Sequence, residues 1–374
     1  MTQLETLIQT LCPNGVKFVK LGEVAVISRG VRVVKKDLSQ IGDIPVYQNS
    51  MQPLGYYDKT NTPAYTAFVI SAGAAGDIGF SDVDFWAADD CLRIQGKEYL
   101  NNKFAYYWLL KNQRYIYSQV RKASIPRLSK DIILSLQIPL PPLAVQSEIV
   151  RILDKFTLYK SELAAELAAR LQQYEYYRDQ LLTFDDTVKR VKLGEVANVL
   201  RGKRLTKSDL NPEAQYDVYH GGIEPLGKYN AANREGDTVM IINVGASAGC
   251  VGYSKVAFWS SDGCFCLSKN DIVNSRFLYY YLLIQEKYLQ SKVRKAGIPT
   301  LDALVINNLL IPLPPLSEQE RIVSILDRFD KLCHDIREGL PAEIDLRQKQ
   351  YEHYRDKLLT FNQPTPNPSL KGRE

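Results

Sequence analysis

Apolar residues recur at every third or fourth position in two long stretches of the chain. The first stretch covers about residues 145–182 and the second about residues 322–354. This heptad spacing is typical of a helix that buries one face along its length, and forty helical residues are about 60 Å long. Only the second stretch contains Gly-Leu-Pro, at 339–341, which predicts a helix break or kink near Gly339, with glycine as the helix stop and proline at the next helix start.

Ahead of each stretch lies a block in which short apolar runs alternate with Gly, Asp and Asn turns. Examples of these runs are Ala-Phe-Val-Ile at 67–70 and Thr-Val-Met-Ile-Ile at 238–242. The alternation predicts a mixed α/β domain built on a strongly bent sheet. Each block closes with an aromatic-rich helical run, at 104–110 and 277–283, whose rings we expect in the core. A short helix over 2–11 precedes the first block.

The two halves of the chain repeat each other. Ile-Pro-Leu-Pro-Pro-Leu at 138–143 returns at 311–316, and Val-Lys-Leu-Gly-Glu-Val-Ala at 19–25 returns at 191–197. The offset changes from 172 to 173 within the block, so the second copy gained one residue in the region of Gly73 and Gly249. The chain is therefore a tandem duplication.

Each long helix needs a surface that covers its apolar face. We expect the two helices to pack on each other, antiparallel about a pseudo-twofold axis. The alternative is that each helix packs on its own block, but forty helical residues exceed the diameter of about 30 Å expected for a 120-residue domain. The predicted fold class is thus α/β (α+β), with two homologous mixed α/β domains separated by two long antiparallel coiled-coil helices.

Charge is unevenly distributed along the chain. The net charge of +5 is modest, but residues 17–137 and 189–310 each carry sixteen Lys and Arg against eleven Asp and Glu. The remaining segments are acidic. A polyanion would therefore bind the two blocks rather than the helices. A solvated surface of mixed charge is the alternative.

Cysteine, histidine and hydropathy exclude several classes of protein. The six cysteines show no paired spacing, and we expect reduced, mostly buried thiols, with Cys264 and Cys266 on opposite faces of a strand. Three histidines give poor support to a zinc cluster or a histidine-dependent triad, so no metal site is expected. No apolar run of about 18 residues and no signal-like start occur, which predicts a cytoplasmic protein without membrane contact.

The chain resembles the specificity subunit of type I restriction-modification enzymes. The duplicated Ile-Pro-Leu-Pro-Pro-Leu leads into Gln-Ser-Glu-Ile-Val at 146–150 and Ser-Glu-Gln-Glu-Arg-Ile-Val at 317–323. Both helices then end in Tyr-Glu-x-Tyr-Arg-Asp, at 174–179 and 351–356. The resemblance covers nearly the whole chain, and the paired arrangement is specific to that family.

The resemblance implies two target-recognition domains, each recognising one half of a split double-stranded DNA sequence, held apart by the long helices. It also implies modification subunits that bind these helices and methylate adenine, and a restriction subunit recruited through the complex. On the helices we expect partner contacts from Ile149, Ile152, Phe156, Ile322, Ile325 and Phe329.

No catalytic residue is expected on this chain. It lacks the Gly-rich cofactor loop and the Asn/Asp-Pro-Pro-aromatic loop of an adenine methyltransferase. The glycine-rich segment 73–79 lacks the G-x-G-x-x-G pattern and the lysine of a P-loop, so we interpret it as a tight sheet turn. S-adenosylmethionine, ATP and Mg²⁺ are therefore expected on partner subunits.

Candidate DNA contacts lie in loops of the two blocks. The loop after the first strand carries Arg29, Arg32, Lys35 and Lys36 in one block and Arg201, Lys203, Arg204 and Lys207 in the other. Candidates for base recognition are Gln48, Asn49, Tyr219 and His220, with turn-stabilising hydrogen bonds as the alternative. Arg121, Lys122 and Arg127, and likewise Arg294 and Lys295, lie near a Pro turn. Basic residues there either complement a helix dipole or contact phosphate.

These observations predict a DNA sequence-recognition subunit. Its expected parts are a first recognition domain with a short leading helix (1–137), a first long helix (138–186), a second recognition domain (187–310), a second helix broken near 339–341 (311–361) and a disordered tail (362–374). The alternatives are an autonomous sequence-specific DNA-binding protein and a coiled-coil adaptor that binds proteins.

Overall fold

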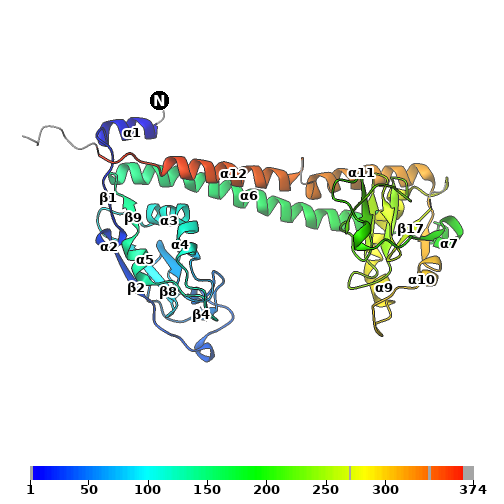
Figure 1. Cartoon of the computed structure of the whole chain (residues 1–374), viewed down its shortest axis with the longest axis horizontal. Helices are drawn as coiled ribbons and strands as arrows, with labels where there is room; N and C mark the ends of the chain where they lie inside the picture. Colours follow the sequence, from blue (N-terminus) through cyan, green and yellow to red (C-terminus); the bar gives the residue numbers. More distant parts are fainter. Residues whose placement is uncertain (1–2, 269–270, 336–337, 365–374) are drawn as a thin grey trace, which may run out of the picture. The chain divides into compact units, whose positions relative to one another are not determined.

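Residues 3–268, 271–335 and 338–364 are described by the computed structural model, in which the chain divides into two units (Figure 1). The first unit contains residues 1–162 and 344–374, and the second contains residues 163–343. Most of the tail for which the sequence predicts disorder, residues 365–374, lies outside the described part.

The first unit combines short helices with small sheets. Its elements are α1 (Gln3–Leu11), β1 (Phe18–Lys20), α2 (Leu21–Val24), β2 (Ala25–Arg29), η1 (Lys35–Asp37), β3 (Ile44–Tyr47), β4 (Gly55–Tyr57), β5 (Thr66–Ile70), β6 (Ile78–Ser81), β7 (Trp86–Ala87), β8 (Cys91–Gly96), α3 (Asn102–Lys111), α4 (Gln113–Ser118), α5 (Lys130–Ser135), β9 (Gln137–Pro139) and the first part of α6 (Leu143–Leu181). Strands β2, β8, β5 and β6 form an antiparallel sheet in that order. Strands β4, β3 and β7 form a second sheet, in which β3 and β7 are parallel. Strands β1 and β9 pair in a third, two-stranded sheet. The mixed α/β class is confirmed, but separate sheets replace the single bent sheet, and the chain turns between them at β7 and β8, where the Cys91 N–H donates to Ala88 O at 3.0 Å.

Strand β5 is the centre of the first domain because both of its faces are buried. Ala67 and Val69 belong to the core cluster that contains Phe104 of α3, whereas Phe68 and Ile70 belong to a second cluster on the other face. Side chains alternate between faces along a strand, so a strand covered on both faces is a continuous apolar run. Phe104, Tyr107 and Trp108 of α3 are buried and Tyr106 is half-buried against the same core, which confirms their assignment to the core.

The second unit repeats this topology. Its elements are β10 (Arg190–Lys192), α7 (Leu193–Val196), β11 (Val199–Arg201), η2 (Lys207–Asp209), β12 (Tyr216–Tyr219), β13 (Gly227–Tyr229), β14 (Thr238–Ile242), β15 (Val251–Ser254), β16 (Trp259–Ser260), β17 (Cys264–Leu267), α8 (Ser275–Ile284), α9 (Glu286–Ser291), α10 (Ala303–Asn307), β18 (Leu310–Pro312), α11 (Leu316–His334) and the start of α12 (Leu340–Leu358). The sheets have the orders β11-β17-β14-β15 and β13-β12-β16.

The glycine-rich segments are hairpin turns, as the sequence predicts. The β5–β6 turn covers residues 71–77 and the β14–β15 turn covers 243–250, so the extra residue of the second copy lies here. Gly73 and Gly76 have φ of +81° and +96°, and Gly245 and Gly249 both have φ of +92°. Side chains other than glycine rarely adopt this conformation, which explains the composition of the turn.

The expected placement of Cys264 and Cys266 on opposite faces of a strand is wrong. Both residues lie on β17 and belong to one core cluster with Met240 and Ile242, and the Cys264 thiol donates to Phe265 O at 3.6 Å. Residues two apart on a strand share a face because side chains alternate with a period of two. Both cysteines are fully buried. They pack in one cluster with Met240 and Ile242 of β14 and with Tyr219 of β12, which belongs to the smaller sheet.

A buried glutamine fixes the start of α6 to the first domain. Strand β9 pairs with β1 and is followed by the proline turn, after which Gln146 is 0% exposed. Its Oε1 accepts from the Asn101 N–H at 2.9 Å, and its Nε2 donates to Tyr99 O and to Pro141 O, both at 2.8 Å. One side chain therefore satisfies three backbone groups, and Asn101 in turn caps the N-terminus of α3.

The second unit contains the same arrangement of a buried glutamine bonded to three backbone groups, here called the glutamine lock. Gln319 is 0% exposed, its Oε1 accepts from the Asn274 N–H at 2.8 Å, and its Nε2 donates to Pro314 O at 2.8 Å and Ile272 O at 3.2 Å. Asn274 caps α8 as Asn101 caps α3. The duplicated proline motif is thus explained by a duplicated contact.

The long helices bury their apolar faces on two kinds of surface. Early in α6, Val145, Ile149 and Leu153 belong to the core cluster of the first domain, so these turns pack on their own domain, which was the alternative for the whole helix. Further along, Phe156 stacks on Tyr354 of α12 with ring centroids 5.3 Å apart.

Helix pairing in both units is antiparallel. In the first unit Phe156 contacts Tyr354 and Lys160 hydrogen-bonds to Gln348. Residue numbers therefore increase along α6 in the direction in which they decrease along α12. In the second unit Tyr174 packs against His334 at 5.5 Å between ring centroids, and Tyr177 stacks on Phe329 at 5.8 Å. The same opposite order of positions relates α6 to α11.

The second long helix is interrupted. Helix α11 ends at His334 and α12 begins at Leu340, so Gly339 lies directly before α12 rather than at the end of α11. Its φ is not positive, and a Cβ there would lie 2.6 Å from Lys331 O and 2.8 Å from Asp335 O. Close backbone approach, rather than the left-handed conformation of a helix stop, requires glycine here. Pro341 lies in the first turn of α12, where a missing N–H costs no hydrogen bond.

Replacement of either buried glutamine should destabilise the fold. Gln146→Leu and Gln319→Leu each leave one backbone N–H and two carbonyls without the partner seen here, and an unsatisfied buried group costs about 1–3 kcal/mol. We expect the free energy of unfolding to fall by about 3–5 kcal/mol in each variant, measured by urea denaturation of the full chain.

The neighbouring exposed residue provides the control. Glu320→Leu should change the free energy of unfolding by no more than about 0.5 kcal/mol, because Glu320 is exposed and no hydrogen bond of its side chain is part of the lock. Equal losses for Gln319→Leu and Glu320→Leu would contradict the proposed role of the amide.

Candidate nucleic-acid interface

Four of the predicted contact residues of the second unit line one cavity. This cavity of about 590 Å³, here called the basic cavity, is lined by Arg201, Arg204, Leu205, Thr206, Lys207, His220, Leu226, Asn243, Val244, Asp262, Gly263 and Thr300. The loop after β11, the end of β12 and the β14–β15 turn therefore converge. Sequence spacing alone does not show this convergence, because the lining residues are up to 99 positions apart, from Arg201 to Thr300.

An Arg-Gly pair places the first loop of each domain. A Cβ on Gly202 would lie 2.0 Å from Ser261 O, and a Cβ on Gly30 would lie 2.0 Å from Ala87 O. Only glycine allows the chain to pass so close to the neighbouring strand. In the second unit the Lys203 N–H then donates to Ser260 O at 2.9 Å, which fixes the loop that follows Arg201.

His220 and Asn243 provide polar groups inside the basic cavity. His220 Nδ1 lies 3.3 Å from Asp262 Oδ1 and 3.3 Å from the Gly263 N–H. Asn243 is 5% exposed, and its Oδ1 has no hydrogen-bond partner in the described part of the chain. Sequence reasoning missed Asn243, although it directly follows the apolar run of β14, where a polar residue marks the point at which the strand leaves the core.

Tyr219 has a packing role. Its ring meets Phe258 edge-on with centroids 5.3 Å apart, and burial raises the pKa of Tyr219. By the offset of 172, the counterpart of His220 is Gln48, which is half-buried at the end of β3. Asn49 is exposed, and its backbone O accepts from the Ala74 N–H at 2.9 Å, so the loop after β3 contacts the β5–β6 turn.

The remaining basic residues lie on a small hairpin. The Arg121 N–H donates to Arg127 O at 2.8 Å and the Arg127 N–H donates to Arg121 O at 3.1 Å; Arg294 and Thr300 form the same pair at 2.9 and 3.1 Å. Helices α4 and α9 end three residues earlier, at Ser118 and Ser291. The hairpins therefore extend beyond the helix ends, which favours the phosphate-contact interpretation over the helix-dipole one.

The predicted basic side chains are exposed and unpaired. These residues are Arg29, Arg32, Lys35, Lys36, Arg121, Lys122, Arg127, Arg201, Lys203, Arg204, Lys207, Arg294 and Lys295. Within the described part of the chain, none of them forms an ion pair with a carboxylate. Cations without internal partners are available to a polyanion.

Comparison with known proteins identifies the family. The model of the type I restriction modification DNA specificity domain matches residues 13–173 and again residues 185–346. The chain belongs to this specificity-subunit family. A protein of Haemophilus influenzae named as a type I restriction enzyme specificity subunit is 33% identical over 96% of this chain and 99% of its own. The EcoR124I/EcoR124II specificity subunit of Escherichia coli is 29% identical over 97% and 99%.

Solved structures agree with the fold. The type I restriction-modification S subunit of M. genitalium superimposes with a TM-score of 0.70 over 92% of this chain and 96% of that one, at 20% identity. A chain from a study of complex assembly and conformational transition in a type I system gives a TM-score of 0.56 over 93% and 98%. Since the relatives are named as specificity subunits, the chain is a non-catalytic specificity subunit rather than an enzyme.

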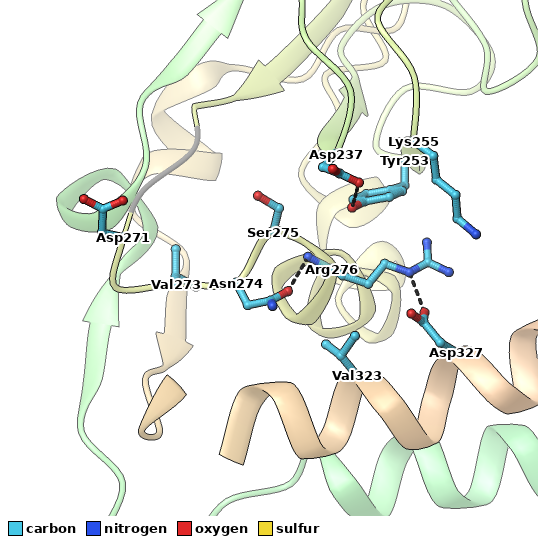
Figure 2. A pocket seen from close by; sticks show the side chains of 10 residues that line it. All are labelled: Asp237, Tyr253, Lys255, Asp271, Val273, Asn274, Ser275, Arg276, Val323 and Asp327. Atoms are coloured by element: carbon cyan, nitrogen blue, oxygen red, sulfur yellow. Dashed lines mark hydrogen bonds and ion pairs between the residues drawn. The ribbon is translucent and has the colours of Figure 1, made fainter. Parts of the chain in front are cut away.

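A second concave site of the specificity subunit lies where α8 meets α11 (Figure 2). Figure 2 shows the Arg276 side chain extended toward Asp327, with Tyr253 beside it. Arg276 donates to Asp327 Oδ1 at 2.7 Å and to Asp330 Oδ2 at 2.8 Å, and its guanidinium lies 4.7 Å from the centroids of both the Tyr253 and Tyr280 rings. This network fastens the second domain to its helix.

The first domain has a weaker version of this network. Lys103 occupies the place of Arg276 and lies 3.2 Å from Asp154 Oδ2, while Tyr107 donates to Asp154 Oδ1 at 2.6 Å. A cavity of about 590 Å³ adjoins these residues, and Leu158 forms part of its wall. Asp154 and Asp327 are the aspartates of the repeated Ile-Leu-Asp-x-Phe sequence, so their place in the repeat is explained by this contact.

The helix residues predicted to bind partners make their contacts within the chain. Ile149 and Ile322 are 0% exposed inside their own domain cores, so a direct partner contact by these two is excluded in this structure. Ile152 and Phe156 pack against the first core and Phe329 against the second. Ile325 is half-buried. A helical apolar pattern marks a covered face and does not say what covers it.

Residues 3–268, 271–335 and 338–364 contain neither a metal-binding cluster nor a membrane-spanning helix. No group of three or more His, Cys, Asp or Glu side chains in these ranges is arranged to hold a metal ion. In the same ranges, no helix has the length and apolar character needed to cross a bilayer.

The two helix–domain networks should differ in strength. Arg276 is 11% exposed and joins two carboxylates, whereas Lys103 is 29% exposed and lies close to Asp154, which is itself 38% exposed. We expect Arg276→Ala to lower the free energy of unfolding by about 2–3 kcal/mol, less than for a fully buried pair because Asp327 is 44% exposed. Lys103→Ala should cost about 1 kcal/mol or less. Both are measured by urea denaturation of the full chain, and equal losses would contradict this difference.

Proposed function

We propose that this specificity subunit recognises a bipartite double-stranded DNA site, with one domain for each half-site. The observation that carries the proposal is the duplicated set of exposed basic side chains without carboxylate partners, gathered in loops at homologous positions of the two domains. Two homologous domains in one chain would bind the two halves of a split target, as the two subunits of a dimeric protein bind paired half-sites. The recognition domains are assigned to residues 1–137 and 187–310, with residues 138–186 and 311–361 as spacer helices.

The residue types divide the work of recognition. Arg29 and Arg201, at the ends of β2 and β11, can each contact guanine with two hydrogen bonds, whereas the lysines that follow suit phosphates. In the basic cavity His220 and Asn243 add groups that differ from the first domain, where Gln48 and Ser71 hold these positions. An amide such as Asn243 pairs well with adenine. Different side chains at equivalent positions would let the two domains recognise different half-site sequences.

Catalysis is proposed for partner subunits. Modification subunits would bind S-adenosylmethionine and methylate adenine, and a restriction subunit that joins through the complex would use ATP and Mg²⁺. The helix–domain cavities are candidate docking sites for the modification subunits because each combines a charged network with apolar or aromatic side chains in its wall. Leu158, in the wall of the first domain's cavity, is 60% exposed. Two homologous cavities suit two copies of one partner.

Loss of one arginine should affect one half-site. After the target has been identified by methylome sequencing, Arg29→Ala and Arg201→Ala should each lower discrimination at a different half by about 1–3 kcal/mol, or roughly five- to 150-fold. Binding of the complex to duplexes with single base changes in either half measures this. Lys203→Ala is the control: it should weaken all duplexes alike and reduce the slope of log affinity against log salt by about 1. Equal losses at both halves would sink the modular proposal.

Lengthening α6 should change the spacing of the target and nothing else. Four residues inserted after Ala165 add about 6 Å of helix. The methylome of a host that carries this variant should show a longer spacer between two unchanged half-sites. An altered half-site sequence, or an unaltered spacer in a variant that still methylates, would show that α6 does not set the distance.

A further inference from the structure

Each unit exposes an isoleucine at the same place. Ile125 is 54% exposed and Ile298 is 71% exposed, and each directly precedes a proline on the small basic hairpin. One exposed apolar side chain is ordinary on a protein surface. Here the same side chain is exposed twice, although the residue before it changes from Ser124 to Gly297. Packing within either domain does not account for this, since most of each side chain is uncovered.

The hairpin holds the isoleucine rigidly. Two backbone hydrogen bonds close each hairpin, and its proline carbonyl anchors it to the turn beside it: the Gly73 N–H donates to Pro126 O at 3.2 Å and the Gly245 N–H to Pro299 O at 2.9 Å. Proline also fixes its own φ and restricts the residue before it. The isoleucine is therefore held in place before any ligand binds, so little conformational entropy is lost on contact.

The hairpin borders the proposed DNA contacts. Thr300 closes the second hairpin, bridges to Val244, and lines the basic cavity together with it. Arg294 and Lys295 on the same hairpin are exposed, and neither is paired with a carboxylate in the described residues. An apolar tip flanked by free cations fits a duplex, because the cations can bind phosphates on either side while the tip enters the groove.

We propose that Ile125 and Ile298 are wedge residues, each of which inserts at one base step of its half-site and partly unstacks it. This inference rests on the proposed function and adds a distortion of the DNA by the specificity subunit itself. Bulky aliphatic side chains open base steps in this way in other DNA-binding proteins. A methyltransferase must take its adenine out of the stack, at a cost of a few kcal/mol. A wedge in each domain would lower that cost before a modification subunit acts.

Fluorescence of 2-aminopurine tests the wedge. The probe is placed in turn at the steps of each half-site, and the duplex is bound by the full complex of this chain with its modification subunits. In the unsubstituted complex one step in each half should brighten. Ile298→Ala should abolish the increase in the second domain's half and leave the other unchanged; Ile125→Ala should do the reverse. Ile298→Leu should keep most of the increase.

Homologous exposed valines provide matched controls. Val83 and Val256 occupy equivalent positions, are 53% and 64% exposed, and lie outside the hairpins, so Val83→Ala and Val256→Ala should leave both signals unchanged. Full brightening in both isoleucine variants would overturn the wedge. The proposed function would still stand in that case if the unsubstituted complex binds its site specifically. Weaker assembly with modification subunits in the absence of DNA, at unchanged brightening, would assign the isoleucines to a protein contact and also overturn it. Absence of specific binding by the unsubstituted complex would count against the proposed function itself.

Discussion

The buried amide at the start of each long helix is the constraint on which the rest of the structure depends. Gln146 and Gln319 each join three parts of the backbone. These are the proline turn, the loop before the aromatic helix, and the asparagine that caps that helix. The first turn of the long helix and the first turn of the aromatic helix are therefore fixed to one another. Any base-recognising loop inherits its orientation relative to the long helix from this joint.

The aromatic helix transmits that orientation to the sheets. On one side, Tyr107 of α3 and Tyr280 of α8 donate to Asp154 and Asp327 of the long helices. On the other side, the same helices pack against β5 and β14, whose opposite faces cover the smaller sheets. The turns that follow β5 and β14 carry the contacts to the basic hairpins. The loops proposed to contact DNA are thus connected to the long helix by packed layers.

Much of this organisation could be predicted from the sequence, because repeats and periodicity are properties of local residue order. The duplication, the mixed domains, the hairpin turns and the buried aromatic helices all follow from such patterns. What covers an apolar helix face depends on tertiary contacts. The sequence pattern therefore does not show that Ile149 and Ile322 lie in domain cores rather than at a surface that binds a partner. Gln146 is recognisable in the sequence as part of a repeated motif, but its contacts are not, because its partners are up to 47 residues away. The same holds for the convergence of His220 and Asn243 on one cavity.

Comparison of the two copies separates the frame from the parts that vary. Asn61 and Asn233 occupy equivalent positions and make equivalent pairs of bonds, to the backbone of Ala87 and of Ser260.

The cation beside them comes from different segments, strand β8 in the first domain and the loop between β13 and β14 in the second. In the first domain Arg93 of β8 donates to Asn61 O, and in the second Arg234 donates to Asn233 O while Cys266 holds the position of Arg93. Arg234 also donates to Arg201 O at 2.9 Å, directly beneath a proposed DNA contact. The support of a proposed DNA-contacting loop can therefore come from a different segment of the chain while the asparagine contacts stay the same. One fold can in this way present different side chains in its two copies.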